Sequence, residues 1–414
     1  MEGDGVKVRV PALRFSGFEG EWQLTNLSAL VDQERKITYG IVQPGEFVDE
    51  GIPLVRGGDY SGSWAKLEDI KRVTIEIDAP YKRSKLKPGD LLLTIVGANT
   101  GNVAVVPDWL DGANITQTTA RIAVASKVAN PNIVKQILES EIGKREVYRY
   151  IKGAAQPGLN LSDVERFQFD LPVNANEQKK IADFLGALDA KLAALREKEA
   201  ELTRFKRGLM QALFSQTLRF TRDDGSNFPD WEETRLGRIA EIVGGGTPDT
   251  CDKLSWNGNI PWFTPTEIKA KYLGESRRKI TKAGLETSAA KMLPVGALLL
   301  STRATVGDVG IATQPACTNQ GFQSLVVRDP NYNEFWYYWL KFNTKELLRR
   351  ASGSTFLEIS KTEVAKIPVL SPHYEEQEKI AEALSAIDAK IATVSDQITQ
   401  LTAFKKGLLQ QMFV

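Results

Sequence analysis

The chain is poor in the residues on which most catalytic and metal sites depend. Its 414 residues include only two cysteines and a single histidine, His373. Cys251 and Cys317 are too few for a disulfide framework, which favours a reducing, cytoplasmic compartment. A single histidine leaves no Ser-His-Asp or Cys-His pair and no His-rich metal site. We therefore expect no catalytic residues, no metal ligands and a solvent-facing His373.

Long apolar runs and a strong net charge are also missing. No stretch approaches the roughly 18 apolar residues that span a bilayer, and residues 1–10 contain acids but no apolar signal segment. The formal net charge of +1 argues against a stand-alone, nonspecific nucleic-acid binder. Local basic patches, or DNA contacts shared with a basic partner, remain compatible with it.

Cofactor motifs are absent as well. The segment Gly244-Gly245-Gly246-Thr247 lacks the lysine of a phosphate-binding loop and is interpreted as a flexible loop. No Gly-x-Gly-x-x-Gly follows a predicted strand. We expect no cofactor bound by this chain.

What the chain does contain is an internal repeat. Glu-Gln-Lys-Lys-Ile-Ala at 177–182 returns as Glu-Gln-Glu-Lys-Ile-Ala at 376–381, and Leu-Asp-Ala-Lys at 188–191 returns as Ile-Asp-Ala-Lys at 387–390. Phe-Lys-Arg-Gly-Leu at 205–209 returns as Phe-Lys-Lys-Gly-Leu at 404–408 with the same offset. One duplicated helical element therefore occurs twice.

Both copies of this element have apolar residues at seven-residue steps, which predicts two long helices with an apolar seam. The seam residues are Ile181, Leu188, Leu195, Leu202 and Leu209 in the first copy, and Ile380, Ile387, Val394, Leu401 and Leu408 in the second. Asn174 with Glu177, and Ser371 with Pro372, are interpreted as helix starts. The alternative is that each helix packs only on its own domain, but the pattern far exceeds a typical helix of ~12 residues.

The segments before each helix match more loosely and predict mixed α/β domains. Leu13-Arg14-Phe15 with Trp22 resembles Leu218-Arg219-Phe220 with Trp231. Short apolar runs alternate with Gly, Pro and Asn turns, at 91–96, 103–106, 297–300 and 324–327. Each domain ends with a predicted capping box, at 162–165 and 360–363, and a strand that contains proline.

The predicted fold class is therefore α/β (α+β), with two similar mixed domains separated by two long antiparallel coiled-coil helices. Four segments follow from it: domain 1 at residues 1–173, a central helix at 174–216, domain 2 at 217–370 and a C-terminal helix at 371–414.

Taken together, these motifs resemble the specificity subunits of type I restriction-modification systems. The resemblance covers nearly the whole chain and depends on the twin helices, the Leu-Arg-Phe…Trp openings, the Gly-Asn-Ile-Pro-Trp segment at 258–262 and the turn before each triple-leucine strand. It implies that each domain is a target recognition domain for one half of an asymmetric, bipartite double-stranded DNA site, and that the helices set the spacer. It also implies two methyltransferase (modification) subunits and further restriction subunits, with S-adenosylmethionine, ATP and Mg on those partners.

Candidate DNA contacts are chosen by side-chain chemistry. Phosphate contacts require cationic or small polar groups, and base edges are recognised by amide, hydroxyl and guanidinium groups. The phosphate candidates are Lys82, Arg83, Lys85 and Lys87, with Arg277, Arg278, Lys279 and Lys282 as an approximate counterpart. The base candidates are Asn99, Thr100, Gln117, Thr118, Gln156, Thr264, Thr266, Arg303, Thr305, Asn319, Gln320 and Gln323. Arg303 ranks highest because a lone arginine after a leucine-rich strand is costly to bury unpaired.

Structural roles compete with several of these assignments. The basic runs could be solvated surface, Asn99 and Thr305 could shape turns, and Gln117 and Gln320 could be buried amides. Trp256, Trp262 and Tyr60 are interpreted as core or rim residues. Two other functions remain open for the whole chain: an autonomous coiled-coil DNA-binding or architectural protein, and a nuclease with an unrecognised site.

Overall fold

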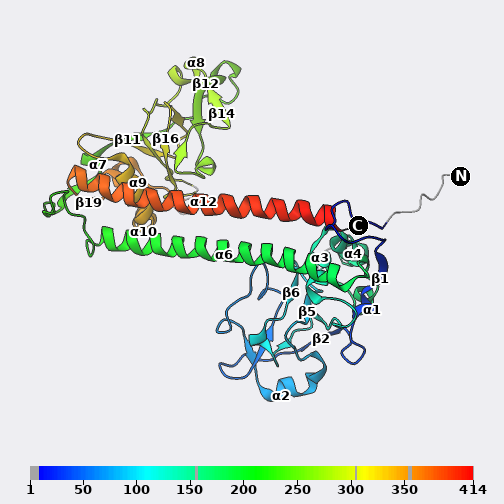
Figure 1. Ribbon diagram of the computed structural model, residues 1–414. Coiled ribbons are helices and arrows are strands. Elements are labelled where there is room, and N and C mark those ends of the chain that lie inside the picture. The colour runs from blue at the N-terminus through cyan, green and yellow to red at the C-terminus, as the bar shows by residue number, and fades with distance from the viewer. Residues whose placement is uncertain (1–8, 154–156, 304, 353–356, 414) are drawn as a thin grey trace. The chain divides into compact units, whose positions relative to one another are not determined.

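The computed structural model describes residues 9–153, 157–303, 305–352 and 357–413 (Figure 1). It divides into two compact units, of which unit 1 comprises Met1–Lys198 and Val394–Val414 and unit 2 comprises Glu199–Thr393. Both boundaries fall inside long helices, since α6 (Ala175–Phe214) and α12 (Tyr374–Met412) each contribute to both units. Among the described residues, no helix is both long and apolar enough to cross a membrane.

The described residues of unit 1 form three small sheets. A four-stranded antiparallel sheet has the order β2 (Thr38–Tyr39), β8 (Thr119–Ile122), β5 (Leu91–Thr94), β6 (Val103–Val105). A three-stranded sheet has the order β4 (Arg72–Val73), β3 (Ile52–Val55), β7 (Asn114–Ile115), with β3 and β7 parallel. The third pairs β1 (Gln23–Asn26) with β9 (Gln168–Leu171). Every residue of β5 is buried, as expected for a continuous apolar run between two covered faces.

The helices of unit 1 surround a core to which both long helices contribute. The shorter helices are α1 (Leu27–Leu30), α2 (Ile75–Asp78), η1 (Ala79–Ser84), η2 (Asp108–Leu110), α3 (Pro131–Glu139), α4 (Glu141–Tyr150) and α5 (Leu161–Glu165). The main cluster includes Ile181 and Leu185 from the start of α6 and Met412 from the end of α12. Opposite ends of the two long helices therefore meet on one core.

In its described residues, unit 2 repeats this plan with one extra strand. Its five-stranded sheet has the order β11 (Ala240–Gly244), β18 (Gln323–Val327), β15 (Leu298–Leu300), β16 (Val309–Ala312), β13 (Tyr272–Leu273). Its three-stranded sheet has the order β14 (Arg278–Ile280), β12 (Trp256–Phe263), β17 (Cys317–Thr318), and β10 (Glu232–Arg235) pairs with β19 (Pro368–Ser371). The parallel pair β12–β17 matches β3–β7 of unit 1.

The core of unit 2 is built in the same way. Its helices are α7 (Leu236–Ile239), η3 (Lys253–Ser255), η4 (Pro265–Glu267), α8 (Lys282–Glu286), α9 (Asn333–Phe342), α10 (Thr344–Arg350) and α11 (Lys361–Lys366). Ile380 and Leu384 from the start of α12 join Leu213 from the end of α6 in its main cluster. The four strands predicted from apolar runs and the two long helices are confirmed.

Within each unit the long helices lie side by side and run antiparallel (Figure 1). In unit 1, Asp189 contacts Lys405, and further along α6 Leu195 lines one groove with Gln397 and Leu401. In unit 2, Lys206 contacts Asp388. The alternative in which each helix packs only on its own domain is wrong, although Ile181 and Ile380 do lie in domain cores.

Several predicted local features differ from the structure. The cap of α5 is Asn160 with Asp163, two residues before the predicted Ser162, whereas Ser360 does cap α11. Asn174 caps α6 as predicted, but the Glu177 carboxylate accepts from Arg14 rather than from the cap. Ser371 ends β19 instead of starting the helix. Short motifs locate a helix start to within a few residues only, because neighbouring polar side chains compete for the same amides.

The glycine-rich segment at 244–247 is not a loose loop, so that interpretation was wrong. A Cβ on Gly245 would lie 2.0 Å from the Asn319 carbonyl oxygen, and one on Gly246 would lie 2.3 Å from the Ala289 carbonyl carbon. The glycines are required because two backbone segments approach there without room for a side chain.

Candidate nucleic-acid interface

Three segments of unit 2 that contain predicted base-contacting residues meet at one place. The Asn319 amide donates to the Phe263 carbonyl at 3.0 Å, which joins the β17–β18 turn to the end of β12. The Thr302 amide donates to the Gly321 carbonyl at 2.8 Å, which joins the segment after β15 to the same turn. The structure therefore brings together Thr264, Thr266, Arg303, Thr305, Asn319, Gln320 and Gln323.

Unit 1 has the corresponding arrangement. The Thr116 amide donates to the Val55 carbonyl at 3.1 Å, and the Ile95 amide donates to the Thr118 carbonyl at 2.8 Å. The β7–β8 turn with Gln117 and Thr118 thus lies between the end of β3 and the segment after β5 that contains Asn99 and Thr100. Gln156, also predicted here, lies outside the described residues.

Two of the predicted amide side chains are exposed to a ligand, whereas the other described amides are buried or form hydrogen bonds within the chain. Gln117 and Asn99 are exposed, which removes the buried-amide interpretation of Gln117. The Gln320 Oε1 accepts from the Thr247 hydroxyl, and the Asn319 Oδ1 accepts from the Gly321 amide at 2.9 Å. The Gln323 Oε1 is buried and has no hydrogen-bond partner among the described residues. Gln117 and Asn99 are therefore the freest amides of the predicted set.

The hydroxyl candidates are mostly engaged in turns. The Thr100 hydroxyl donates to the Gly97 carbonyl at 2.6 Å, and the Thr264 hydroxyl donates to the Glu267 Oε2 at 2.7 Å. The remaining hydroxyls form hydrogen bonds with other hydroxyls: Thr118 with Thr116, Thr266 with Thr264, and Thr305 with Ser301. These residues hold the shape of the segments that present the exposed amides.

The reason for ranking Arg303 first was wrong. Its guanidinium forms an ion pair with Glu358, and the two side chains are 43% and 36% exposed. Arg303 is neither lone nor buried, so the cost of burying an unpaired charge does not apply to it. A paired, half-exposed arginine beside the β17–β18 turn remains suited to a guanine edge.

The two basic runs differ in how their charges are used. In the first, Lys82, Arg83 and Lys87 are exposed, whereas Lys85 Nζ lies 2.6 Å from Asp78. In the second, Arg277 is exposed, and Lys279 and Lys282 pair with Glu275 and Glu286. The Arg278 guanidinium lies 3.4 Å from the ring centroid of Trp256, which is buried, like Trp262 and Tyr60, as predicted.

The two runs are not counterparts, contrary to the sequence interpretation. Arg278 and Lys279 of the second run lie on β14, which pairs with β12 just as β4 pairs with β3. The structural equivalent of Arg278 is therefore near Arg72, while Lys82 and Arg83 lie in η1, after α2. Charge alone does not identify equivalent positions when strand pairing is unknown.

Three residues at these junctions were missed. Arg56 follows β3 and pairs with Asp59 at 2.9 Å, in the position that Thr264 and Glu267 occupy after β12. Thr247 and Glu358 contact Gln320 and Arg303. The two glycines after Arg56 were a turn signal available in the sequence, but nothing in the sequence linked Glu358 to Arg303.

The repeated Glu-Gln motif attaches the domain openings to the long helices. The Glu177 carboxylate accepts from Arg14 Nε at 2.7 Å and from Trp22 Nε1 at 3.3 Å. The Glu376 carboxylate accepts from Arg219 Nε at 3.1 Å and from Trp231 Nε1 at 3.1 Å. The Arg and Trp of each opening are therefore the partners of the glutamate of the Glu-Gln motif.

The glutamine of the same motif connects each long helix to a domain helix. Gln178 accepts from the Asn130 amide before α3 and donates to the Pro172 carbonyl. Gln377 accepts from the Tyr332 amide before α9 and donates to the Pro372 carbonyl. Both glutamines are buried, so each amide meets its hydrogen-bonding needs within its unit.

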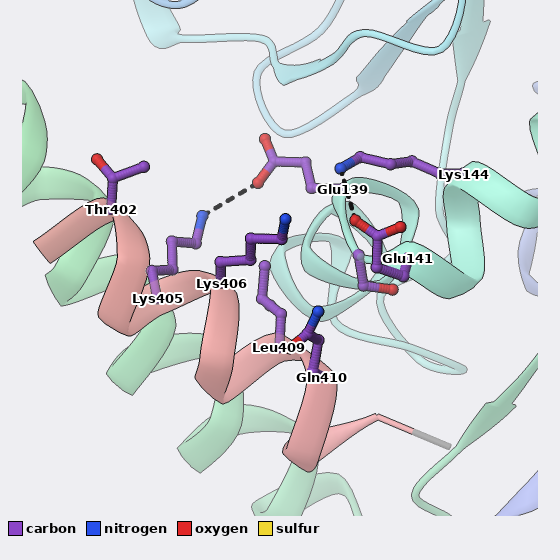
Figure 2. A pocket seen from close by; sticks show the side chains of 9 residues that line it. Glu139, Glu141, Lys144, Thr402, Lys405, Lys406, Leu409 and Gln410 are labelled. Carbon is purple, nitrogen blue, oxygen red and sulfur yellow. Dashed lines mark hydrogen bonds and ion pairs between the residues drawn. The ribbon is translucent and has the colours of Figure 1, made fainter. Parts of the chain in front are cut away.

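The aspartate of the Asp-Ala-Lys motif and the lysine of the Phe-Lys motif form what we call the helix joints. In the first joint, Asp189 of α6 accepts from Lys405 of α12 and, at 2.7 Å, from Gln136 Nε2 of α3. Lys405 also lies 3.2 Å from Glu139 at the end of α3 (Figure 2). Burial, the largest single effect, raises the pKa of Asp189, but Lys135 and Lys405 together outweigh it and the pKa is lowered.

The second joint has the same plan with the helices exchanged. Asp388 of α12 accepts from Lys206 of α6 at 2.5 Å and from the Tyr338 hydroxyl of α9 at 2.7 Å. Tyr338 thus replaces Gln136 as the donor from the domain. The two repeat copies pair crosswise, each aspartate with the lysine of the other copy.

All ten predicted seam residues are buried or half-buried. By contrast, Phe205 and Phe404, equivalent positions in the repeat, are 61% and 54% exposed. No group of three or more His, Cys, Asp or Glu side chains arranged to hold a metal occurs in the described part of the chain.

Comparison with known proteins agrees with this architecture. A family described as type I restriction modification DNA specificity domain matches residues 44–204 and again residues 229–403. The chain belongs to this family and contains its domain twice. The two matches correspond to the two copies of the repeat.

The chain is also similar to proteins named as type I specificity subunits. The chain is 34% identical over 212 residues to the type I restriction enzyme MjaIX specificity subunit of Methanocaldococcus jannaschii, and this alignment covers 50% of the chain and 49% of the relative. It is 32% identical to the EcoBI specificity subunit of Escherichia coli, over 44% of the chain and 36% of the relative. These two matches span half or less of each relative. A putative MjaX specificity subunit is 24% identical over 94% of the chain and 92% of its own length.

Solved structures show the fold over the full length. The type I restriction-modification S subunit from M. genitalium superposes with a TM-score of 0.63 at 16% identity, covering 98% of this chain and 99% of that one. A chain from a study of type I system assembly and conformational transition gives 0.55 at 21% identity. The family and fold class inferred from sequence are confirmed. The names of the relatives agree with a specificity subunit rather than a catalytic one.

Proposed function

We propose that this chain recognises one asymmetric, bipartite DNA sequence as the specificity subunit of a type I restriction-modification complex. Domain 1 recognises one half-site and domain 2 the other, while α6 and α12 set the spacer. The observation that supports this most directly is the crosswise pairing of the helix joints. It gives each recognition domain an equivalent attachment to both helices, as a pseudo-twofold reader of two half-sites requires.

The recognition surface of each domain is the junction of three segments described above. Exposed amides at Gln117 and Asn99, and the Arg303–Glu358 pair with the β17–β18 turn, supply the chemistry that base edges require. Lys82, Arg83, Lys87 and Arg277 supply exposed cations for phosphates. Because these sets differ between the domains, the half-sites differ.

The chain has no catalytic role in this proposal. Two methyltransferase subunits dock along the helices, and restriction subunits join them, in the cytoplasm. S-adenosylmethionine, ATP and Mg are bound by those partners. The exposed, equivalent Phe205 and Phe404 support the docking of two copies of one partner, since large exposed apolar side chains favour burial in a contact. Phe205→Ala with Phe404→Ala should lower the number of bound methyltransferase subunits without unfolding the chain.

Methylation-sensitive sequencing of DNA from cells with the complete complex tests the proposal. It should reveal one motif with two different half-sites and a constant spacer. Replacing residues 217–370 with the matching domain of a relative should change one half-site only. A change in both half-sites, or a continuous motif, would contradict the proposal.

The spacer role has its own experiment. Removing residues 192–198 together with 394–400 takes one heptad from each helix and retains both joints. The spacer should shorten while both half-sites stay the same. An unchanged spacer would exclude the helices as its determinant.

A test of partner dependence distinguishes this proposal from the alternative of an autonomous DNA-binding protein. Adding the methyltransferase subunit should raise DNA affinity and its resistance to salt. If affinity stays constant, the chain acts alone. Cleavage of DNA by the purified chain with magnesium would instead make it a nuclease.

A further inference from the structure

The apolar seam alone does not specify one register of the helix pair. Its residues recur every seven positions, so a shift of one helix by a heptad, about 10.5 Å, again places one aliphatic side chain opposite another. Apolar contacts are also non-directional, so they hold two surfaces together without fixing their rotation. A polar pair within such a seam does specify register, because a shift leaves its charges unpaired.

The helix joints have this property in both units. Lys405 is 11% exposed and pairs with both Asp189 of α6 and Glu139 of α3. Figure 2 shows its contact with Glu139. Lys206 is 23% exposed and lies 2.5 Å from Asp388, which also accepts from Tyr338. A shift or rotation in either unit would separate charges that have lost much of their water, which is costly.

Each joint also includes the recognition domain, and this distinguishes it from a simple helix-to-helix bridge. Gln136 and Lys135 of α3 donate to Asp189 at 2.7 and 2.8 Å. In the second joint, the Tyr338 hydroxyl of α9 donates to Asp388 of α12 at 2.7 Å. One carboxylate therefore fixes three elements: its own helix, the opposite helix and the domain.

We propose that the two helix joints restrict the DNA spacer to a single length, with Lys206 and Lys405 as the positioning residues that determine it. This inference depends on the proposed function. The lysines do not contact DNA in it; they hold each recognition domain at one orientation and register on the helix pair. Loss of both lysines leaves the half-site preferences intact and lets the domains engage half-sites whose spacing differs by about three base pairs, because a heptad shift of ~10.5 Å corresponds to that length at ~3.4 Å per base pair.

The test compares matched double variants in the complete complex. Lys206→Met with Lys405→Met removes both joint cations and keeps the apolar stems. Lys191→Met with Lys390→Met is the control, because these lysines lie on the same helices, are exposed, and form no ion pair among the described residues. Lys206→Arg with Lys405→Arg retains the charges. Methylated sites are then sequenced and sorted by spacer length.

We expect the joint variant to methylate sites with spacers about three base pairs longer or shorter roughly tenfold more often than the unmodified chain does, with unchanged half-sites. The control should keep the original spacer, and the arginine variant should largely restore it. A general loss of folding lowers methylation at all sites without changing the spacer distribution. If the double variant does not assemble, each single variant is sequenced, with the same but smaller effect expected.

Two failures are distinguishable. If the unmodified complex yields no bipartite motif, the proposed function is wrong. If it yields one motif and the joint variant keeps a single spacer, the bipartite function stands and the role of the joints is refuted.

Discussion

Replacing Glu177 with glutamine should loosen the attachment of the domain 1 opening to α6. The Glu177 carboxylate is 1% exposed and accepts from Arg14 Nε at 2.7 Å, from Arg14 Nη2 at 2.8 Å and from Trp22 Nε1 at 3.3 Å. Glutamine has nearly the same shape but no charge and only one acceptor oxygen. The substitution therefore removes one acceptor and the charge from a buried site.

The expected cost follows from these contacts. Removing one partner of a fully buried ion pair costs about 3–5 kcal/mol. Arg14 is 13% exposed and also donates to the Gly20 and Glu19 carbonyls, so its charge is not left alone. We therefore expect about 2–3 kcal/mol, in the upper part of the range of about 1.5–3 kcal/mol for a hydrogen bond to a charged group. For a unit of this size that corresponds to a fall of about 5–10 °C in the unfolding midpoint.

The matched control is Asp183→Asn on the same helix. Asp183 pairs with Lys179 at 2.5 Å, but the two side chains are 61% and 68% exposed, so the cost should stay below about 0.5 kcal/mol. Because two units need not unfold together, amide hydrogen exchange gives the local measurement. Protection of β1 and β9 should fall by a factor of about 30–100 in the Glu177 variant, while β10 and β19 keep theirs. Equal effects of the two substitutions would refute the argument.

Three further predictions concern the interface and the joints. Replacing Lys82, Arg83 and Lys87 with glutamine should reduce the slope of log affinity against log salt by up to about 3, and an unchanged slope would exclude phosphate contacts. Arg303→Ala should relax base preference at one position of the second half-site by about 1–3 kcal/mol, whereas a uniform loss across sequences would exclude base recognition. The pKa of Asp189 is lowered because Lys135 and Lys405 outweigh the effect of burial, so this carboxylate stabilises unit 1 above its unfolded pKa of about 3.9 and stops doing so as pH falls through the lower folded value. In the Asp189→Asn variant, the free energy of unfolding, measured by urea titration, should therefore fall less steeply as the pH drops below about 4. The same steepness in the variant and the unmodified chain would contradict this.

The features predicted well from sequence are those that depend on local or periodic patterns. The long helices followed from apolar residues at seven-residue steps, and the buried strands β5 and β15 followed from runs of leucine. The duplication was visible because both copies keep the same residues at the same offset. Each of these signals lies within a short window of chain or repeats itself, so no knowledge of distant contacts is needed.

The features predicted poorly depend on which distant residues meet. Arg303 was ranked for being unpaired, but its partner Glu358 is far along the chain. The two basic runs were matched by charge, whereas strand pairing aligns β14 with β4. The glycine-rich segment was interpreted as loose because its close contacts with Asn319 and Ala289 come from other segments.

The sequence by itself determined that the chain has two similar halves and that each half ends in a long helix with an apolar seam. It also determined to which family the chain belongs. These features could be predicted because periodicity and duplication are properties of residue order. Only the tertiary structure decided what the repeated polar residues do. The carboxylates of Glu177 and Glu376 accept hydrogen bonds from Arg and Trp side chains of the domain openings. Those of Asp189 and Asp388 each accept from a lysine of the other helix. A charged side chain shows in the sequence that it needs a partner, but the backbone path decides which residue comes within hydrogen-bonding distance.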